Sequence, residues 1–343
     1  MVTLSTPTTA SGVRDMRWIR VEEASAVSSC RSTAAALAGK LGFPPARADQ
    51  LTLAVTEAGS NLHKHAREGW LMLRISPDAA VPGIELVTID SGPGLRDVPA
   101  ALRDGHSTAG TLGIGLGAIR RLADFCDLYS VPGHGTALVA RFWPVPGQAA
   151  SGCAGLSCAG LIRPIASEVE SGDAFAAVRT GQTLTAVLCD GLGHGPLAAA
   201  ASSEAVASVL EDSLGEPAAL LERVHRRLGR TRGGAVGIVQ VTGPVARFAG
   251  LGNVAAWIIS DGLRTGMMSV PGIAGHQARS IRQFEYSVPD GAAIIMHSDG
   301  LSSRWDIGAL PRLERKDPLV IAAVLLAEAG IHRDDASVLV LRP

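Results

Sequence analysis

Apolar residues recur at helical spacing in the first part of the chain, and short β-branched runs stand between these stretches. The helical spacing predicts amphipathic helices, and the β-branched runs predict strands. The expected helices cover 24–41, 46–66 and 118–125, and the expected strands cover 17–22, 71–75, 84–89, 127–131 and 136–143.

Beyond residue 155, short β-branched runs dominate the pattern and helical stretches interrupt them. The expected strands cover 184–189, 235–241, 255–259, 292–297 and 338–341, and the expected helices cover 198–214, 218–229 and 319–329. This alternation predicts an α+β fold in which helices are layered on antiparallel sheets.

The segment 144–152, PVPGQAASG, has the composition of a linker. A chain of 343 residues is also long enough for two domains at roughly 100–200 residues each. We therefore expect a flexible tail over 1–14, a first domain over 15–143, a linker over 144–155 and a second domain over 156–343.

Charge and cysteine content exclude several classes of protein. The 31 basic and 32 acidic residues give a net charge of -1, without the basic excess typical of nucleic-acid binding. No apolar run approaches the roughly 20 residues of a membrane span, and the N-terminus lacks the features of a secretory signal. The five cysteines are scattered and form no zinc motif. We expect a cytoplasmic protein without a nucleic-acid or membrane partner.

The first candidate site combines a helix with two glycine-rich segments. Glu57 and Asn61 are four residues apart and share one helix face, where a carboxylate and an amide oxygen suit a magnesium–phosphate site. Taken alone, such a pair is more often a solvated helix face. A strand then ends at Asp90 in a D-x-G-x-G turn with Gly92 and Gly94, which could by itself be an ordinary turn.

The second glycine-rich segment, 110–117, precedes a helix and could bring backbone N–H groups close to an anion. Its G-x-G-x-G string lacks the preceding strand and the G-x-G-x-x-G spacing of a dinucleotide site, so the Rossmann interpretation is weak.

Together, these motifs and Gly135-Thr136 resemble the GHKL (Bergerat) ATP-binding fold of gyrase, the Hsp90 chaperone, histidine kinases and MutL. Residues 104–136 resemble anti-sigma-factor serine kinases, most closely the RsbT-type switch kinase. The resemblance covers about residues 15–143 and implies an α/β sandwich that binds ATP and Mg²⁺.

By this resemblance, Glu57 is the catalytic base and Asn61 the magnesium ligand, while Asp90 hydrogen-bonds the adenine amino group. His63 and His65 are assigned to the helix surface or the site rim rather than to phosphate acceptance. The remaining cofactor-binding residues are Gly92, Gly94, Gly113, Gly115, Gly117 and Thr136.

The second candidate site consists of aspartates beside glycine or at strand ends. A single D-G pair is usually a turn, but several in this order predict carboxylates that converge at one end of a sheet, where they suit Mg²⁺ or Mn²⁺. Two such ions can direct a hydroxide at a phosphate. The aspartates are Asp173, Asp190, Asp299 and the adjacent pair Asp334 and Asp335.

The string D-G-L-G-H-G at 190–195, the G-L-G-N-V at 250–254 and the late D-D-x-S-V resemble SpoIIE-type metal-dependent serine/threonine phosphatases. Residues 231–238 resemble the small RsbX-type members. Coverage is about 156–343, and the implied fold is an α-β-β-α sandwich with two Mn²⁺ or Mg²⁺ ions.

By this second resemblance, Asp190 bridges both metals and the Gly191 carbonyl is a further ligand. Asp173 and Asp299 ligate one metal and Asp334 the other, although the adjacent Asp335 could take that role. The usual acidic residue shortly after the first aspartate is missing, because Ala176 and Ala177 follow Phe175. His194 either assists as an acid or only supports the rim of the metal site.

Both resemblances together imply a bifunctional partner-switching regulator. It would phosphorylate and dephosphorylate a STAS-domain antagonist or stressosome-like scaffold protein, in a pathway that ends on a sigma factor or a response regulator. An alternative makes the first domain an ATP- and partner-binding sequestration module with little kinase activity, which regulates an active phosphatase domain. In a third hypothesis, ATP is only an allosteric signal for the phosphatase.

Overall fold

The structure is a computed structural model that describes residues 8–11, 16–76, 82–102, 115–147, 158–165, 168, 170–331 and 333–343. The chain forms two compact units. The first unit is Asp15–Gly155, and the second unit combines Met1–Arg14 with Leu156–Pro343. The first unit is therefore inserted into the sequence of the second.

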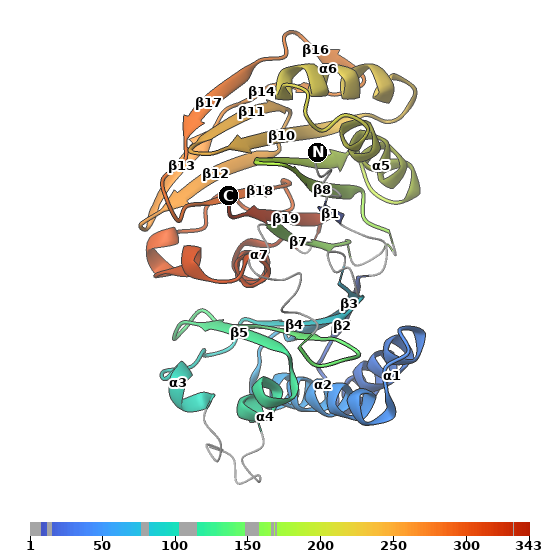
Figure 1. Cartoon of the computed structure of the whole chain (residues 1–343), viewed down its shortest axis with the longest axis vertical. Helices are drawn as coiled ribbons and strands as arrows, with labels where there is room; N and C mark the ends of the chain where they lie inside the picture. The colour runs from blue at the N-terminus through green and yellow to red at the C-terminus, as the bar shows by residue number, and fades with distance from the viewer. Residues whose placement is uncertain are drawn as a thin grey trace, which may run out of the picture. The chain divides into compact units, whose positions relative to one another are not determined.

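The first unit is a five-stranded antiparallel sheet with helices packed on one face (Figure 1). The sheet order is β2 (Arg17–Arg20), β3 (Trp70–Ile75), β4 (Ile84–Asp90), β6 (Thr136–Phe142) and β5 (Phe125–Ser130). The helices are α1 (Ala24–Lys40), α2 (Pro45–His65), the short α3 (Val98–Ala101) and α4 (Gly115–Leu122).

The core of the first unit follows from alternation in the strands and helical spacing in α2. Leu51, Val55 and Leu62 of α2 are buried in one cluster with Leu73 of β3 and Leu86 of β4. Burying side chains of this size contributes about 1.5–3 kcal/mol each before the entropy of ordering is counted. The resulting contact fixes α2 over β4, the strand that ends at Asp90.

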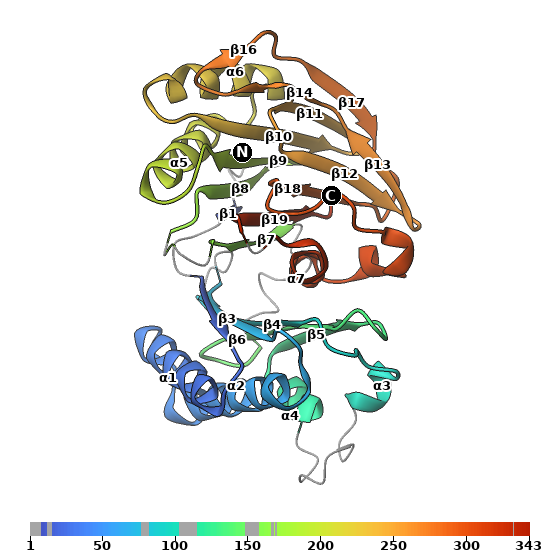
Figure 2. The ribbon, with the colours of Figure 1, turned by 180° about the vertical axis from the view of Figure 1, so that it is seen from behind.

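The second unit contains two large sheets with helices on their outer faces (Figure 2). Helices α5 (Pro196–Leu210) and α6 (Pro217–Arg227) cover the first sheet, and α7 (Pro318–Ala329) packs on β7 and β19 of the second. The first sheet has the order β1 (Thr8–Ser11), β8 (Asp173–Thr180), β9 (Thr183–Gly191), β10 (Gly234–Thr242), β11 (Val245–Leu251) and β14 (Ser269–Val270), with β17 (Gln283–Ser287) also on β11. The second has the order β13 (Leu263–Met267), β12 (Ala255–Ser260), β18 (Ala293–His297), β19 (Ala336–Leu341) and β7 (Cys158–Arg163).

The two sheets of the second unit meet face to face. A Cβ added to Gly160 on β7 would lie 2.5 Å from the Phe175 ring on β8, so the glycine makes room for the phenyl group. The unit therefore has the layer order helix, sheet, sheet, helix, and the predicted α+β fold class of both domains is confirmed. A two-stranded ribbon of β15 (Gly272–Ile273) and β16 (Gln277–Ala278) was not predicted.

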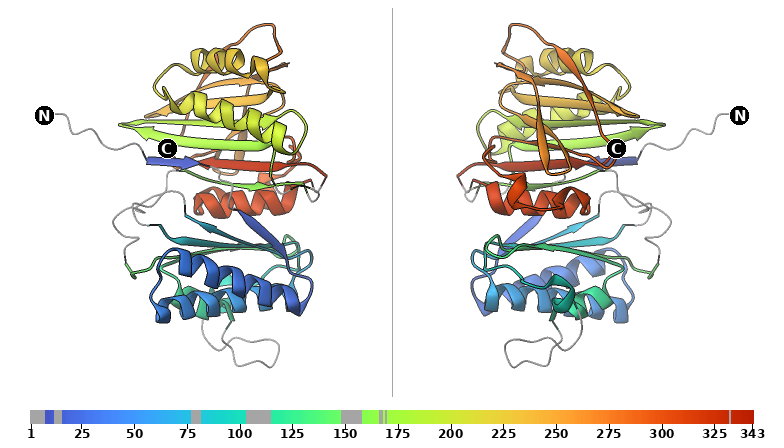
Figure 3. Two further views of the ribbon diagram at one scale, coloured as in Figure 1. Left: turned by 90° about the vertical axis from the view of Figure 1, so that its right-hand side faces the viewer. Right: turned by 90° about the vertical axis from the view of Figure 1, so that its left-hand side faces the viewer.

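The structure differs from the expected flexible tail at Thr8–Ser11. These residues form β1, which pairs antiparallel with β8 from Thr8 opposite Arg179 to Ser11 opposite Ala176 (Figures 2 and 3). A strand at a sheet edge gains a ladder of backbone hydrogen bonds from its neighbour, which a sequence of small residues does not reveal. The chain segment before the first unit is thus part of the second unit's sheet.

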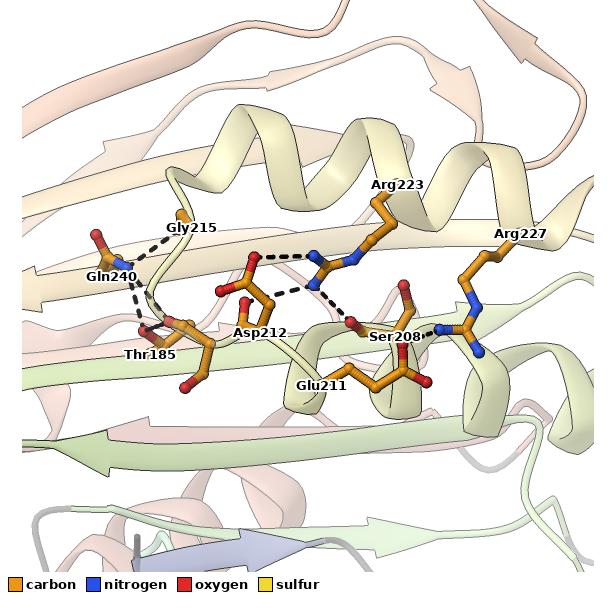
Figure 4. Close-up of polar contacts among 9 residues, drawn as sticks. Thr185, Ser208, Glu211, Asp212, Gly215, Arg223, Arg227 and Gln240 are labelled. Atoms are coloured by element: carbon orange, nitrogen blue, oxygen red, sulfur yellow. Dashed lines mark hydrogen bonds and ion pairs between the residues drawn. The ribbon is translucent and has the colours of Figure 1, made fainter. Parts of the chain in front are cut away.

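The turn between α5 and α6 is fixed by a polar network (Figure 4). Arg223 of α6 donates to the Ser208 carbonyl at 2.6 Å and to Asp212 Oδ2 at 3.0 Å, so it ties the helices together. Thr185 Oγ1 of β9 donates to the Ser213 carbonyl at 2.7 Å, and the Gln240 amide of β10 donates to the same turn. The helix pair is thereby anchored to β9 and β10, the strands that lead to Asp190 and Gly234.

Candidate functional sites

Asp90 lies at the end of β4, opposite Thr136 in the register of β6. Its Oδ1 accepts a hydrogen bond of 2.7 Å from the Gly92 N–H. Burial raises the pKa of Asp90 to about 6, and backbone N–H groups of Gly92 and Thr136 offset only part of that effect. The group is a half-buried hydrogen-bond acceptor near a turn, and its recognition of an adenine amino group remains a prediction.

Glycines around Asp90 are sterically required. A Cβ at Gly92 would lie 2.6 Å from Asp90 Oδ1, and one at Gly94, where φ is +69°, would lie 2.2 Å from the Val131 carbonyl oxygen. At Gly135, where φ is +73°, a Cβ would lie 1.8 Å from the Asp90 carbonyl oxygen. The turn can therefore close around the Asp90 carboxylate only because these positions carry no side chain.

Glu57 and Asn61 are half-buried on α2, and neither side chain makes a hydrogen bond or ion pair with another described residue. The segment directly after this helix reaches the Asp90 turn, because Ser91 N–H donates to the Arg67 carbonyl at 2.9 Å. Placing Glu57 and Asn61 in a catalytic centre remains a prediction. His63 and His65 are exposed, and His63 Nδ1 lies 3.2 Å from the Glu22 carbonyl oxygen, as a helix-surface role requires.

Helix α4 begins at Gly115, so Gly115 and Gly117 occupy its first turn rather than the loop before it. Gly113 lies outside the described residues. The helix is fixed to α2 through Arg47, which donates to the Leu122 carbonyl at 2.6 Å and pairs with Asp124. Free N–H groups at the start of such a helix favour an anion.

In the second unit, Asp173 and Asp190 face each other as cross-strand partners on β8 and β9. Asp173 is 4% exposed, and neither of its carboxylate oxygens has a hydrogen-bond partner among the described residues. Burial raises the pKa of Asp173 to about 7, and the Ser298 and Ser337 hydroxyls nearby offset part of it. An orphaned buried carboxylate of this kind is unfavourable without a cation.

Asp190 and Asp299 come close enough for their side chains to interact directly, although Asp190 belongs to β9 of the first sheet and Asp299 follows β18 of the second. Burial, followed by repulsion from Asp173 and Asp299, raises the pKa of Asp190 to about 9, and Asp334 adds to the repulsion. The structure thus brings four predicted ligands, Asp173, Asp190, Asp299 and Asp334, within electrostatic reach at one end of the two sheets.

Asp334 and Asp335 have different surroundings. Asp335 is 3% exposed and accepts hydrogen bonds from the Ile165 N–H at 2.8 Å and the Gly172 N–H at 2.7 Å, one on each carboxylate oxygen. Asp334 is exposed, and its Oδ1 accepts the Asp335 N–H at 2.9 Å. Asp335 therefore fastens the loop before β8, and Asp334 retains lone pairs for a ligand.

Two further contacts at this site were missed by sequence reasoning. Asn253, in the turn between β11 and β12, donates its side-chain N–H to Asp299 Oδ2. His194 Nδ1 lies 2.9 Å from Glu168 Oε1, a contact at the rim. The G-L-G-N turn was the available signal for Asn253, since an amide at a strand end often orients a carboxylate.

The residues present fit divalent cations. Two orphaned Asp173 oxygens and mutual repulsion among carboxylates are relieved by positive charge. Within the described ranges, no three Asp, Glu, His or Cys side chains already converge on one point. Mg²⁺ commonly keeps several waters and takes only one or two carboxylates from a protein. Gly191 ends β9 opposite Gly234, where a Cβ would lie 2.3 Å from the Asp190 carbonyl oxygen.

Comparison with known proteins defines the class of the first unit. Residues 21–142 match the model of the histidine kinase-like ATPase domain. The chain is also 30% identical over 131 residues to the serine/threonine-protein kinase RsbT of Bacillus subtilis (strain 168), which covers 38% of this chain and 98% of that protein. The chain therefore belongs to the RsbT family of serine/threonine-protein kinases, and the predicted resemblance of its first unit is confirmed.

Two solved structures are each similar to more than half of this chain. A chain from the bacterial stressosome, described as a modular system adapted to control secondary messenger signalling, is 26% identical with a TM-score of 0.50 and covers 54% of this chain and 98% of that one. RsbX in complex with magnesium is 19% identical with a TM-score of 0.48, over 53% of this chain and 92% of that one. Among the described residues, no helix has the length and apolar character needed to cross a bilayer.

Proposed function

We propose that the protein is a bifunctional partner-switching regulator. Its first unit transfers the γ-phosphoryl group of ATP to a serine or threonine of a STAS-domain partner, and its second unit hydrolyses the resulting phosphoester. The observation that supports the phosphatase half is the pair of Asp173 oxygens that lack a hydrogen-bond partner among the described residues, in electrostatic contact with Asp190 and Asp299, which a bound cation would stabilise. The kinase half rests on membership of the RsbT family.

In the first unit, the Asp90 carboxylate accepts a hydrogen bond from the adenine amino group, and Gly92 and Gly94 leave room for the ring. The N–H groups that begin α4 approach the phosphates. The Glu57 carboxylate takes the proton of the attacking hydroxyl, and Asn61 supplies an amide oxygen to Mg²⁺. Positioning and electrostatic stabilisation provide most of the rate in such a transfer.

In the second unit, Asp173, Asp190, Asp299 and Asp334, with the Gly191 carbonyl, would hold two Mn²⁺ or Mg²⁺ ions. Such ions supply Lewis acidity, which lowers the pKa of water and neutralises phosphoryl charge. Asn253 orients Asp299, and Asp335 keeps the loop before β8 in place, so these residues position the ligands. His194, held by Glu168, stands at the rim, where it can donate a proton to the leaving hydroxyl.

The partner is proposed from the names of the relatives. RsbT is a serine/threonine-protein kinase, and one structural neighbour comes from the stressosome. A STAS-domain scaffold or antagonist protein suits both, and a sigma factor or response regulator would lie further along the pathway.

The test is a transfer and release assay on the full chain. Purified protein is incubated with γ-³²P-labelled ATP, Mg²⁺ and candidate STAS proteins, and the labelled partner is then exposed to Mn²⁺ without ATP. We expect incorporation that Glu57→Ala removes and release that Asp190→Ala removes. Nucleotide binding without any transfer would contradict the kinase half and favour the sequestration module. A change in release caused by Asn61→Ala would favour ATP as an allosteric signal.

A further inference from the structure

The turn Thr231–Gly234, between α6 and β10, lies against the loop that carries Asp190. Leu192 N–H donates to the Gly233 carbonyl at 2.9 Å, and Gly234 pairs with Gly191 in the sheet register. The turn is therefore joined to the loop after Asp190 by the hydrogen bond from Leu192 and by the position of Gly234 opposite Gly191 in the sheet. Neither the proposed metal ligands nor their positioning residues include any side chain of this turn.

The backbone of the turn is held at several points. Thr231 Oγ1 donates to the Leu228 carbonyl at 2.8 Å and accepts the Gly233 N–H at 3.0 Å. His276 Nε2 lies 3.0 Å from the Arg232 carbonyl oxygen, and Gly233 has φ of +72°, where a side chain would be strained. These contacts fix the backbone of Arg232 relative to the loop that follows Asp190.

The Arg232 guanidinium remains available. Its side chain is exposed and makes no hydrogen bond or ion pair with another described residue. One guanidinium nitrogen lies 3.1 Å from where a Cβ of Gly193 would stand, so the group rests on the loop three residues beyond Asp190. The guanidinium thus lies over a glycine backbone and makes no hydrogen bond or ion pair with another described residue.

We propose that Arg232 binds the phosphoryl oxygens of the phosphoserine or phosphothreonine substrate at the metal site. This inference rests on the proposed phosphatase function. A guanidinium presents parallel N–H donors that match two phosphoryl oxygens, and its charge complements a dianion next to an otherwise acidic site. Gly193 is part of the fit, because a side chain there would meet the guanidinium.

Arg232→Ala and Arg232→Lys test this assignment, with Arg230→Ala as the matched control. Arg230 is also exposed, lies two residues away and makes no hydrogen bond or ion pair with a described residue. The probes are a phosphothreonine peptide and p-nitrophenyl phosphate as substrates and inorganic phosphate as a product inhibitor, all with Mn²⁺. Arg232→Ala is expected to raise KM and the inhibition constant of phosphate by about 10-fold or more, since a charge-assisted hydrogen bond is lost. For Arg232→Lys, KM and the inhibition constant of phosphate should lie between those of wild type and those of Arg232→Ala.

A second readout does not depend on turnover. In the inactive Asp190→Ala background, adding Arg232→Ala should weaken binding of a fluorescein-labelled phosphothreonine peptide, and adding Arg230→Ala should not. The Mn²⁺ concentration for half-maximal activity should be the same in wild type and Arg232→Ala. Unchanged KM, phosphate inhibition and peptide binding would overturn the proposal, as would a shift confined to the Mn²⁺ dependence.

Failure of the proposed function gives a different pattern. In that case wild type, Arg230→Ala and Arg232→Ala would all release phosphate at the background rate of Asp190→Ala. The peptide would also bind equally well with and without Arg232. This pattern would contradict the phosphatase function and, with it, the proposed role of Arg232.

Discussion

The two units each contain a carboxyl group whose pKa is raised by burial, and the two groups are satisfied differently. Asp90 accepts a hydrogen bond from the Gly92 N–H, and its pKa of about 6 leaves it ionised at neutral pH. Asp173 has no hydrogen-bond partner on either oxygen among the described residues, and its pKa rises to about 7. The Asp90 carboxylate thus has a hydrogen-bond partner within the protein, whereas the Asp173 carboxylate has none among the described residues and would be stabilised by a cation.

This contrast accounts for how each site is built. The Asp90 site is held by glycines that let backbone close around one carboxylate. The proposed metal site would take Asp173, Asp190, Asp299 and Asp334 from the ends of both sheets, and a bound cation would relieve the repulsion among these carboxylates. Removing a ligand should therefore affect the two units in different ways.

The largest effect is expected from Asp190→Ala. This aspartate interacts with the other three proposed ligands, so its loss should reduce Mn²⁺-dependent hydrolysis of a phosphopeptide to background. Nucleotide binding by the first unit should not change, which serves as the control. In calorimetric titrations with Mn²⁺, the heat of binding seen with wild type should be absent for Asp190→Ala. Hydrolysis retained within a few-fold of wild type would show that the metal assignment is wrong.

Glu57→Ala should reduce phosphoryl transfer by about 100- to 10,000-fold, the usual contribution of a general base. ATP affinity should stay within a few-fold, because the carboxylate acts on the acceptor hydroxyl. Radiolabel incorporation into a STAS partner measures the first quantity, and fluorescent-nucleotide displacement measures the second. An equal loss of both would assign Glu57 to nucleotide binding instead.

ATP affinity should depend on pH through Asp90. Its pKa of about 6 means that the carboxylate becomes protonated, and loses its role as acceptor, as the pH falls through 6. Affinity should decline by up to about tenfold per pH unit below that value and level off above it. Asp90→Asn should bind weakly at every pH. A wild-type profile that is flat between pH 5 and 7 would contradict the role of Asp90.

A smaller effect is expected from Asn253→Ala, which removes the side-chain N–H donated to Asp299. Mn²⁺ affinity should fall by about 10-fold or more, as when an outer-shell partner of a metal ligand is lost. At saturating Mn²⁺ most of the activity should return. Activity that stays low at saturation would mean that Asn253 contacts the substrate rather than the ligand.

The D-G pairs after β-branched runs predicted Asp190 and Asp299, and the position of Asp173 beside Gly172 predicted the third aspartate, because aspartates next to glycine at the ends of apolar runs stand out in sequence. Asp334 and Asp335 could not be separated in that way. They differ only because the Ile165 and Gly172 N–H groups, from a distant segment, converge on Asp335. The Asn253 contact with Asp299 joins residues 46 positions apart, so it depends on how the loops meet in three dimensions.

Contacts with the rest of each unit explain where the fold differs from the prediction. Thr8–Ser11 has little strand character of its own and gains order from the edge of β8. The glycines at 115 and 117 favoured a loop in sequence, yet they lie in the first turn of α4, where Gly117 is buried. Contacts from the rest of the unit outweigh local propensity in both places.

The central claim is that one chain adds phosphate to a partner and removes it again. The most direct measurement follows the phosphorylation of one STAS protein by mass spectrometry, first with ATP and Mg²⁺ and the Asp190→Ala chain, then after adding Mn²⁺ and the Glu57→Ala chain with ATP removed. The account predicts that one serine or threonine gains phosphate in the first stage and loses it in the second. Phosphate that is never gained, or that persists after the second stage, would contradict it.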